Sequence, residues 1–259
     1  MKITLVDYDK YSKAEPFPHC IIENFLPDEL ATELSEKFPD LGEINTKRYA
    51  DPNQRKFSLE SFSTLDKSYR FLGELLSDKG FLKSLQVMIG SSEALFYDES
   101  LRGGGCHQSK EGGFLGMHID FNKHTEHRDW DRRVNLIIFL NKKWESHWGG
   151  ELVLANKDGS DRVIVKPEFN KAVFFSTTQD SWHGVPNPVA NKGEVSRNTL
   201  AFYYYSYGRS DGYGGIDAHT TKFDGHDANI YRKSYVFLYN KLRLVFGKKM
   251  ITLLKSIFR

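Results

Sequence analysis

Three residues of the chain have the types and the spacing of a metal site. His118 and Asp120 stand two positions apart at the end of an apolar run over residues 114–119. Side chains alternate along a strand, so the two would point to the same side if this run is a strand. His183 follows much later, in a Ser-Trp-His-Gly sequence. Two histidines and one carboxylate form the facial triad that holds iron(II) and leaves open positions for a cosubstrate and dioxygen. The pattern predicts that these three residues are iron ligands and the catalytic centre.

Arg197 is the second feature that could do chemistry. It stands fourteen residues after His183, directly before a strand-like run. A guanidinium group pairs with a carboxylate through two parallel hydrogen bonds and keeps its charge at any working pH. Thr199 would point to the same side of the strand and add a hydroxyl group. Together they predict an anchor for the distal carboxylate of a dicarboxylic acid, and with the iron site they indicate 2-oxoglutarate.

Short strand-like runs must position these residues. They begin after Gly103, continue to Tyr207, and alternate with turn signals such as Gly112-Gly113 and Asp158-Gly159. Many short strands joined by such loops predict a mainly β fold, a double-sheet jelly roll or barrel, with a β core at about 103–207. The clearest runs are residues 114–119, 134–140, 151–154, 162–165, 172–176 and 199–205.

Helical spacing appears before and after this core. The periods of apolar residues predict helices at about 27–38, 65–76 and 81–87, packed on the outer face of one sheet. We expect one domain over residues 1–230 and a basic helical appendage over 231–259. From Arg232 onward there are eight Lys and Arg and no acid, and the other 28 Lys and Arg against 34 Asp and Glu give −6. This tail could lie on an anionic membrane surface. The favoured interpretation is that its apolar stripe packs on the domain or on a second subunit of a homodimer.

Composition excludes several classes of protein. A net charge of +2 argues against nucleic-acid binding through bulk electrostatics. Two cysteines exclude a disulfide scaffold and a cysteine-rich zinc site and favour a reducing compartment. The start of the chain lacks the apolar run of a signal peptide, and no stretch approaches the roughly 20 apolar residues that span a bilayer. The expected location is therefore the cytoplasm.

The motifs also resemble those of a known family. Over about residues 15–210 the chain resembles the iron(II)/2-oxoglutarate-dependent dioxygenases, in particular the prolyl-4-hydroxylase-like branch. An isolated His-x-Asp is a weak signal, whereas seven matching runs in the family's order are a strong one. These runs are residues 16–19, 104–107, 113–120, 132–141, 148–152, 181–184 and 197–199.

The resemblance implies a double-stranded β-helix with iron(II) on the triad and 2-oxoglutarate on Arg197. It implies hydroxylation of a C–H bond with release of succinate and carbon dioxide, by default on a prolyl residue of a peptide or protein. A free amino acid, a sugar or a lipid-linked small molecule is an alternative substrate, and ascorbate (vitamin C) is a candidate additional cofactor. Rival hypotheses are a non-catalytic jelly-roll binding module and a zinc hydrolase, neither of which needs the anchor at Arg197.

Two positions depart from the family's pattern. His107 stands where some related hydroxylases have a tyrosine, and Phe139 where another tyrosine lies near the cosubstrate. We therefore expect His107 and Asn135 to line the cosubstrate pocket. The charged loop over residues 122–132 is expected to contact the substrate or close over it. Its histidines, His124 and His127, are expected to be solvated.

Overall fold

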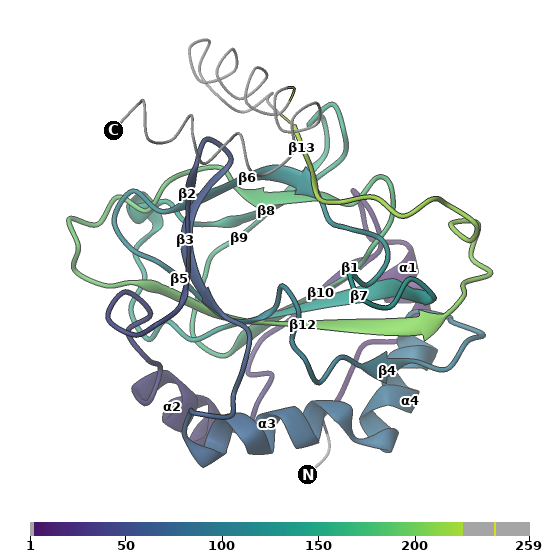
Figure 1. Cartoon of the computed structure of the whole chain (residues 1–259), viewed down its shortest axis with the longest axis horizontal. Coiled ribbons are helices and arrows are strands. Elements are labelled where there is room, and N and C mark those ends of the chain that lie inside the picture. The colour runs from purple at the N-terminus through teal and green to yellow at the C-terminus, as the bar shows by residue number, and fades with distance from the viewer. Residues whose placement is uncertain (1–2, 225–240, 242–259) are drawn as a thin grey trace.

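A curled antiparallel sheet forms the centre of the protein (Figure 1). The structure is a computed structural model that describes residues 3–224 and residue 241. The sheet has thirteen strands, which confirms the mainly β, jelly-roll fold class. The strands are β1 His19–Ile22, β2 Lys47–Asp51, β3 Gln54–Leu59, β4 Phe96–Tyr97, β5 Gly105–Ser109, β6 Phe114–Ile119, β7 Trp130–Phe139, β8 Leu152–Ala155, β9 Arg162–Val165, β10 Lys171–Ser176, β11 Trp182–Val185, β12 Arg197–Tyr207 and β13 Lys222–Phe223.

The sheet folds into two layers that face each other. The strand order is β1-β10-β7-β12-β5-β3-β6-β11-β8-β9. In Figure 1, β10, β7 and β12 form the lower layer and β6 and β8 the upper one, while β3 and β5 connect the layers at one side. The functional residues predicted from the sequence lie on strands of both layers, so closure of the sheet brings them together.

The predicted strands agree closely with the observed ones, but the sheet extends beyond residues 103–207. Residues 114–119 and 162–165 form β6 and β9 with the predicted limits, and the other four runs shift by a few residues. The sequence did not predict β1, the β2–β3 hairpin, β4, β5, β11 or β13. β2 and β3 carry mostly polar, partly exposed side chains, so hydrophobic alternation does not mark them. Pairing of β3 with β5 and β6 places this hairpin in the sheet.

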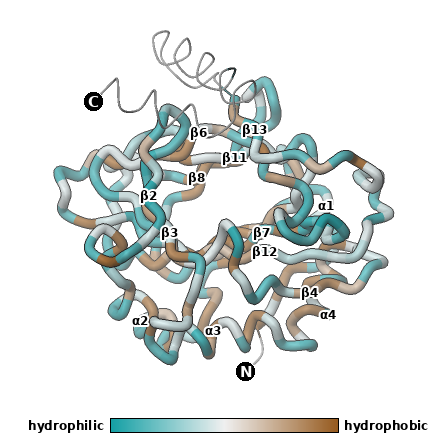
Figure 2. Tube along the Cα trace, in the orientation of Figure 1, coloured by the Kyte–Doolittle hydropathy of each residue, from teal (hydrophilic) through white to brown (hydrophobic). Residues whose placement is uncertain are grey.

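Three helices cover the outer face of the lower layer, as predicted (Figure 1). They are α2 Asp28–Glu36, α3 Lys67–Ser77 and α4 Lys79–Met88, and a short helix, α1 Tyr8–Ser12, precedes them. Asp66 and Asp78 cap α3 and α4 by accepting hydrogen bonds from backbone N–H groups of the first turn. The buried face of α3 consists of Ser68, Tyr69, Leu72 and Leu76. Hydrophobic residues gather between these helices and the sheet (Figure 2), so the main core lies outside the barrel. A smaller cluster that includes Phe139, Leu154 and Phe175 packs between the two layers, beside the site.

Alternation along β12 separates the core from the interior. Leu200, Phe202 and Tyr204 belong to the core under the helices. Arg197, Thr199, Ala201 and Tyr203 line the pocket on the opposite face. A register shift between Tyr204 and Tyr205 buries Tyr205 as well, so two adjacent tyrosines are fully enclosed.

Two predictions concern membranes and the tail. No helix in the described part of the chain is long and apolar enough to cross a membrane. The appendage over 231–259 lies outside the described residues, apart from Lys241.

Candidate metal centre and active site

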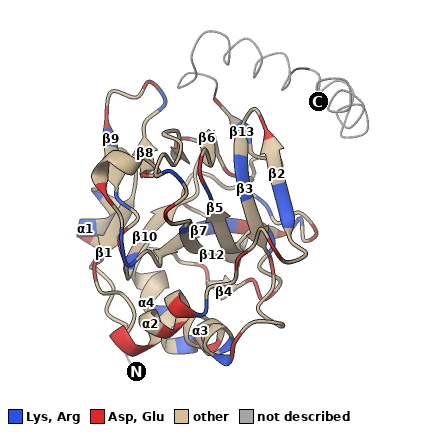
Figure 3. Cartoon of the chain, turned by 90° about the vertical axis from the view of Figure 1, so that its left-hand side faces the viewer, with Lys and Arg blue, Asp and Glu red and all other residues tan. Residues whose placement is uncertain are grey.

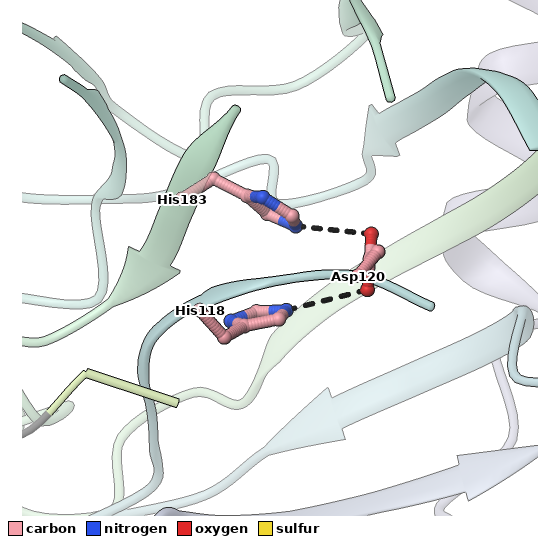
Figure 4. Close-up of side chains that lie close together, drawn as sticks. All are labelled: His118, Asp120 and His183. Atoms are coloured by element: carbon pink, nitrogen blue, oxygen red, sulfur yellow. Dashed lines mark ion pairs between the residues drawn. The ribbon is translucent and has the colours of Figure 1, made fainter. Parts of the chain in front are cut away.

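The structure brings His118, Asp120 and His183 together at one side of the barrel interior (Figure 4). His118 lies near the end of β6, Asp120 directly follows that strand, and His183 lies on β11. The two histidines are directly paired across the strands. The Nε2 atoms of His118 and His183 lie 3.5 and 3.3 Å from the two carboxylate oxygens of Asp120. One ligand atom of each residue lies within 4.8 Å of the others, and all three side chains are buried.

Backbone carbonyls fix which nitrogen of each histidine faces the triad. The Nδ1 of His118 lies 2.9 Å from the carbonyl oxygen of Gly116, and the Nδ1 of His183 lies 3.0 Å from that of Ser181. A carbonyl oxygen only accepts, so each Nδ1 carries the proton in these bonds. Each Nε2 is then left with a lone pair directed at the space beside Asp120. Metal-binding histidines are commonly oriented by such a bond from the other ring nitrogen.

Arg132 and Asn135 hold the carboxylate of Asp120. The Nη2 of Arg132 and the Nδ2 of Asn135 both donate to the same oxygen, Oδ2, over 2.9 and 2.7 Å. The Nε of Arg132 also donates to Oδ1 of Asn135 over 2.8 Å. Burial alone would raise the pKa of Asp120. The positive charge of Arg132 opposes this effect and holds that pKa well below its usual value.

The donor set fits a divalent transition metal such as iron(II). Burial and the neighbouring His183 lower the pKa of His118, which favours the neutral imidazole that a metal requires. The two imidazoles and the ionised carboxylate border a pocket of about 550 Å³. The pocket leaves room beside the triad for small-molecule ligands, as a catalytic metal site needs.

Arg197 lies in the same pocket at the first residue of β12. Its Nε donates to the carbonyl oxygen of Gly150 over 2.6 Å, and its guanidinium lies 5.3 Å from the ring centroid of Phe139. Burial lowers the pKa of Arg197 to about 10, with Glu151 opposing that effect, so the group stays charged at neutral pH. Thr199 is buried and lines the pocket beside it. The geometry is that of a cationic anchor, and its role stays a prediction.

His107 and Asn135 both line the pocket, as expected from the sequence, but their surroundings differ. His107 is paired across the strands with Thr199 and lies on the anchor side. Asn135 is engaged with Asp120 and Arg132, so the structure places it behind the metal ligand. Asn135 is therefore better placed to hold Asp120 than to contact a cosubstrate.

Sequence reasoning missed Arg132 and Lys56, which also face this interior. Arg132 is fully buried, with its guanidinium 3.4 Å from the ring centroid of Tyr203 and 4.4 Å from that of Phe121. A charged residue at the start of an apolar run was the available signal, because a cation inside a buried strand needs a partner. Lys56 had no comparable signal, since its strand was not predicted.

The loop after the triad differs from the sequence expectation. It spans residues 122–129, because β7 begins at Trp130, and His124 is only 1% exposed. Its Nδ1 lies 3.2 and 3.1 Å from the backbone nitrogens of Glu126 and His127, which donate to it. The expectation that His124 is solvated was wrong, because its buried ring accepts hydrogen bonds from the backbone of the loop. His127 is exposed, as expected. Lys123, Thr125 and Arg128 of this loop line the pocket.

Comparison with known proteins agrees with this geometry. Residues 104–205 match the family model described as the 2OG-Fe(II) oxygenase superfamily. The mouse prolyl 3-hydroxylase OGFOD1 is 24% identical over 213 residues, which cover 74% of this chain and 33% of that protein. The chain thus spans about one third of the length of this relative.

Solved structures share the fold. A Trichoplax adhaerens prolyl hydroxylase, solved with a hypoxia-inducible-factor peptide, superposes with a TM-score of 0.54 at 19% identity, covering 73% of this chain and 83% of that one. A Pseudomonas putida prolyl-4-hydroxylase also gives 0.54 at 17% identity, covering 78% and 97%. At these identities the similarity establishes a common architecture.

Proposed function

We propose that the chain, whose residues 104–205 match the family model of the 2OG-Fe(II) oxygenase superfamily, is an iron(II)- and 2-oxoglutarate-dependent dioxygenase that hydroxylates a prolyl residue of a peptide or protein. The family match spans six of the seven sequence runs, all but residues 16–19, and agrees with the resemblance inferred from them. The observation that carries the proposal is the pairing of a buried His-Asp-His triad with a buried arginine in one pocket.

Each part of the pocket has a distinct task in this proposal. Bound iron(II) supplies activation of dioxygen, coupled to conversion of 2-oxoglutarate into succinate and carbon dioxide. His118, Asp120 and His183 would hold the metal, and Arg132 keeps Asp120 ionised in its absence. Arg197 binds the far carboxylate and so orients the cosubstrate toward the triad. Ascorbate is a further candidate, as a reductant, and no residue of the pocket points to it specifically.

The relatives support a prolyl substrate. The mouse relative is named a prolyl 3-hydroxylase, and both structural neighbours are prolyl hydroxylases, one of them in complex with a peptide. A small-molecule substrate is the second candidate. The lining of the pocket includes charged residues that suit either class, namely Lys47, Glu60, Arg102, Lys123 and Arg128.

The test is succinate formation by iron-loaded protein, followed by a screen of prolyl peptides and metabolites by mass spectrometry. The expected result is a mass gain of one oxygen on a prolyl peptide, dependent on both iron(II) and 2-oxoglutarate. Hydrolysis with zinc and without 2-oxoglutarate would instead identify a zinc hydrolase. Metal and 2-oxoglutarate binding without any turnover would support a binding module.

Replacing Arg197 with alanine should weaken 2-oxoglutarate binding while metal binding survives. Removing one partner of a buried charged pair costs about 2–5 kcal/mol, which corresponds to at least roughly 30-fold in the dissociation constant. Calorimetric titration of the Mn(II)-loaded protein with 2-oxoglutarate measures this. Arg197→Lys should be intermediate because it keeps the charge and loses the fork. Arg162→Ala on exposed β9 is the control, and normal 2-oxoglutarate binding by Arg197→Ala would contradict the anchor.

The tail over 231–259 is proposed as an accessory element of a cytoplasmic enzyme, outside a catalytic domain of residues 1–230. Its charge supports this, since eight cations without an acid follow an acidic body. A chain ending at residue 230 should retain Mn(II) and 2-oxoglutarate binding and should show a smaller oligomer by light scattering. Loss of both ligands would place the tail in the catalytic unit. Salt-sensitive sedimentation of the full chain with anionic liposomes would favour the membrane alternative over the subunit contact.

A further inference from the structure

Lys56 is a cation of the pocket that has no acidic partner among the residues the structure describes. It lies on β3, is partly buried and lines the pocket with the triad and Arg197. Other lysines of the same pocket are neutralised: Lys47 lies 3.0 Å from Glu60, and Lys123 lies 2.7 Å from Asp131. No ion pair joins Lys56 to a carboxylate within the described residues. Its contacts are the Nδ1 of His107 at 3.4 Å and the ring of Tyr49 at 5.5 Å.

The strand register places Lys56 in a row with Arg197. Ser109 on β5 is directly paired with Arg197 on β12. On its other side, the pairing of Phe57 with Gln108 places Lys56 beside Ser109 by continuation of the register. Neighbouring strands lie about 4.8 Å apart, so the Cα atoms of Lys56 and Arg197 are separated by roughly 10 Å. Their long side chains both enter the pocket and can meet one anion above Ser109. Figure 3 shows the basic residues on β3.

The adjacent row adds an unused hydrogen-bond donor. Ser58, His107 and Thr199 are paired across β3, β5 and β12. Lys56 can only donate, so the Nδ1 of His107 accepts in their contact and the proton of the ring lies on Nε2. In the described part of the chain this Nε2 makes no hydrogen bond of normal geometry, although backbone groups of Gly103 and Gly104 lie near the ring, and the buried hydroxyl of Ser58 has no partner there either. Buried donors without partners are costly, which points to a ligand that satisfies them.

We propose that Lys56 and His107 form a second anchor, opposite Arg197, for the distal carboxylate of 2-oxoglutarate. This inference rests on the proposed function and adds to it. The carboxylate has room for several donors, because each of its two oxygens accepts more than one hydrogen bond. Arg197 supplies a fork from one side, and Lys56 with the Nε2–H of His107 supplies donors from the other.

The electrostatics support a carboxylate at this place. Burial lowers the pKa of Lys56 to about 8; Asp120 opposes this effect, and Arg197 adds to it. Lys56 therefore lies within electrostatic range of both Asp120 and Arg197. Burial and the charge of Lys56 also hold the pKa of His107 well below its usual value, so the ring is neutral and keeps its accepting Nδ1. An anion in the pocket offsets the repulsion between the two cations.

The test is calorimetric titration of Mn(II)-loaded protein with 2-oxoglutarate. Lys56→Met should raise the dissociation constant at least about tenfold, with metal stoichiometry and thermal unfolding unchanged. The matched control is Arg55→Met, which removes the same charge from the neighbouring, exposed position of β3 and should have no effect. Lys56→Arg should restore part of the affinity.

A double variant distinguishes one shared carboxylate from two separate anions. If Lys56 and Arg197 bind the same group, the effects of Lys56→Met and Arg197→Met on the dissociation constant will be non-additive. A dissociation constant of Lys56→Met within twofold of the parent value would overturn the second anchor and leave the proposed function intact. Failure of the parent protein itself to bind 2-oxoglutarate would overturn the proposed function, and the anchor with it.

Discussion

Replacing His183 with alanine should abolish activity and leave the protein with little bound metal. In the proposed metal site the side chain is one of three ligands found among the described residues, and its Nδ1 is already held by the carbonyl oxygen of Ser181, so the ring is oriented for this task. Changes to residues that merely orient metal ligands typically cost about 10- to 100-fold in affinity or activity. Loss of a ligand itself should therefore exceed roughly 100-fold. Metal analysis after dialysis, together with succinate formation, measures the two effects separately.

The control for His183 is a histidine far from the triad. The side chain of His147 is 74% exposed, so His147→Ala should retain the metal stoichiometry and the activity of the parent protein. His118→Ala should behave like His183→Ala, because both rings face the same carboxylate. Unchanged metal content in both triad variants, with thermal unfolding showing that they are folded, would remove the metal assignment.

The triad could be predicted from the sequence because its geometry is mostly local. His118 and Asp120 need only strand alternation to share a side, and the run before them is apolar enough to be read as a strand. Arg197 and Thr199 follow the same rule along β12. His183 is distant along the chain, so its assignment to the triad depended on its residue type and on the family resemblance. In the structure, direct pairing of β11 with β6 brings the centroid of its ring to 4.3 Å from that of His118.

The surroundings of the triad could not be predicted in the same way. Lys56 enters the pocket because β3 lies between β5 and β6. The sequence of a polar hairpin contains no pattern that predicts this long-range pairing. His124 was misjudged because its neighbours in the sequence are charged. Its burial comes from contacts with Trp130 and Tyr205, whose rings lie 5.0 and 5.5 Å away. In both cases tertiary packing overrides the local pattern.

Replacing Arg132 with methionine should destabilise the metal-free protein strongly, and metal should restore much of the loss. Arg132 is fully buried and bonds the carboxylate of Asp120, which lies deep in the pocket with no other described cation in hydrogen-bond contact. Removing one member of a buried ion pair leaves an uncompensated charge and costs about 3–5 kcal/mol of unfolding free energy. The pKa of Asp120 should rise in the variant, because the positive charge that holds it down is gone.

The metal dependence distinguishes this role from ordinary packing. A divalent ion on Asp120 supplies positive charge at the same carboxylate, so Mn(II) should raise the melting temperature of Arg132→Met by more than that of the parent protein. Arg133→Met is the matched comparison: Arg133 is equally enclosed but bonds Glu93 and Ser206, away from the triad. It should lose stability that Mn(II) does not selectively restore. Equal metal-induced shifts in both variants would show that Arg132 acts through packing against Tyr203 and Phe121 and that its charge does not prepare Asp120 for the metal.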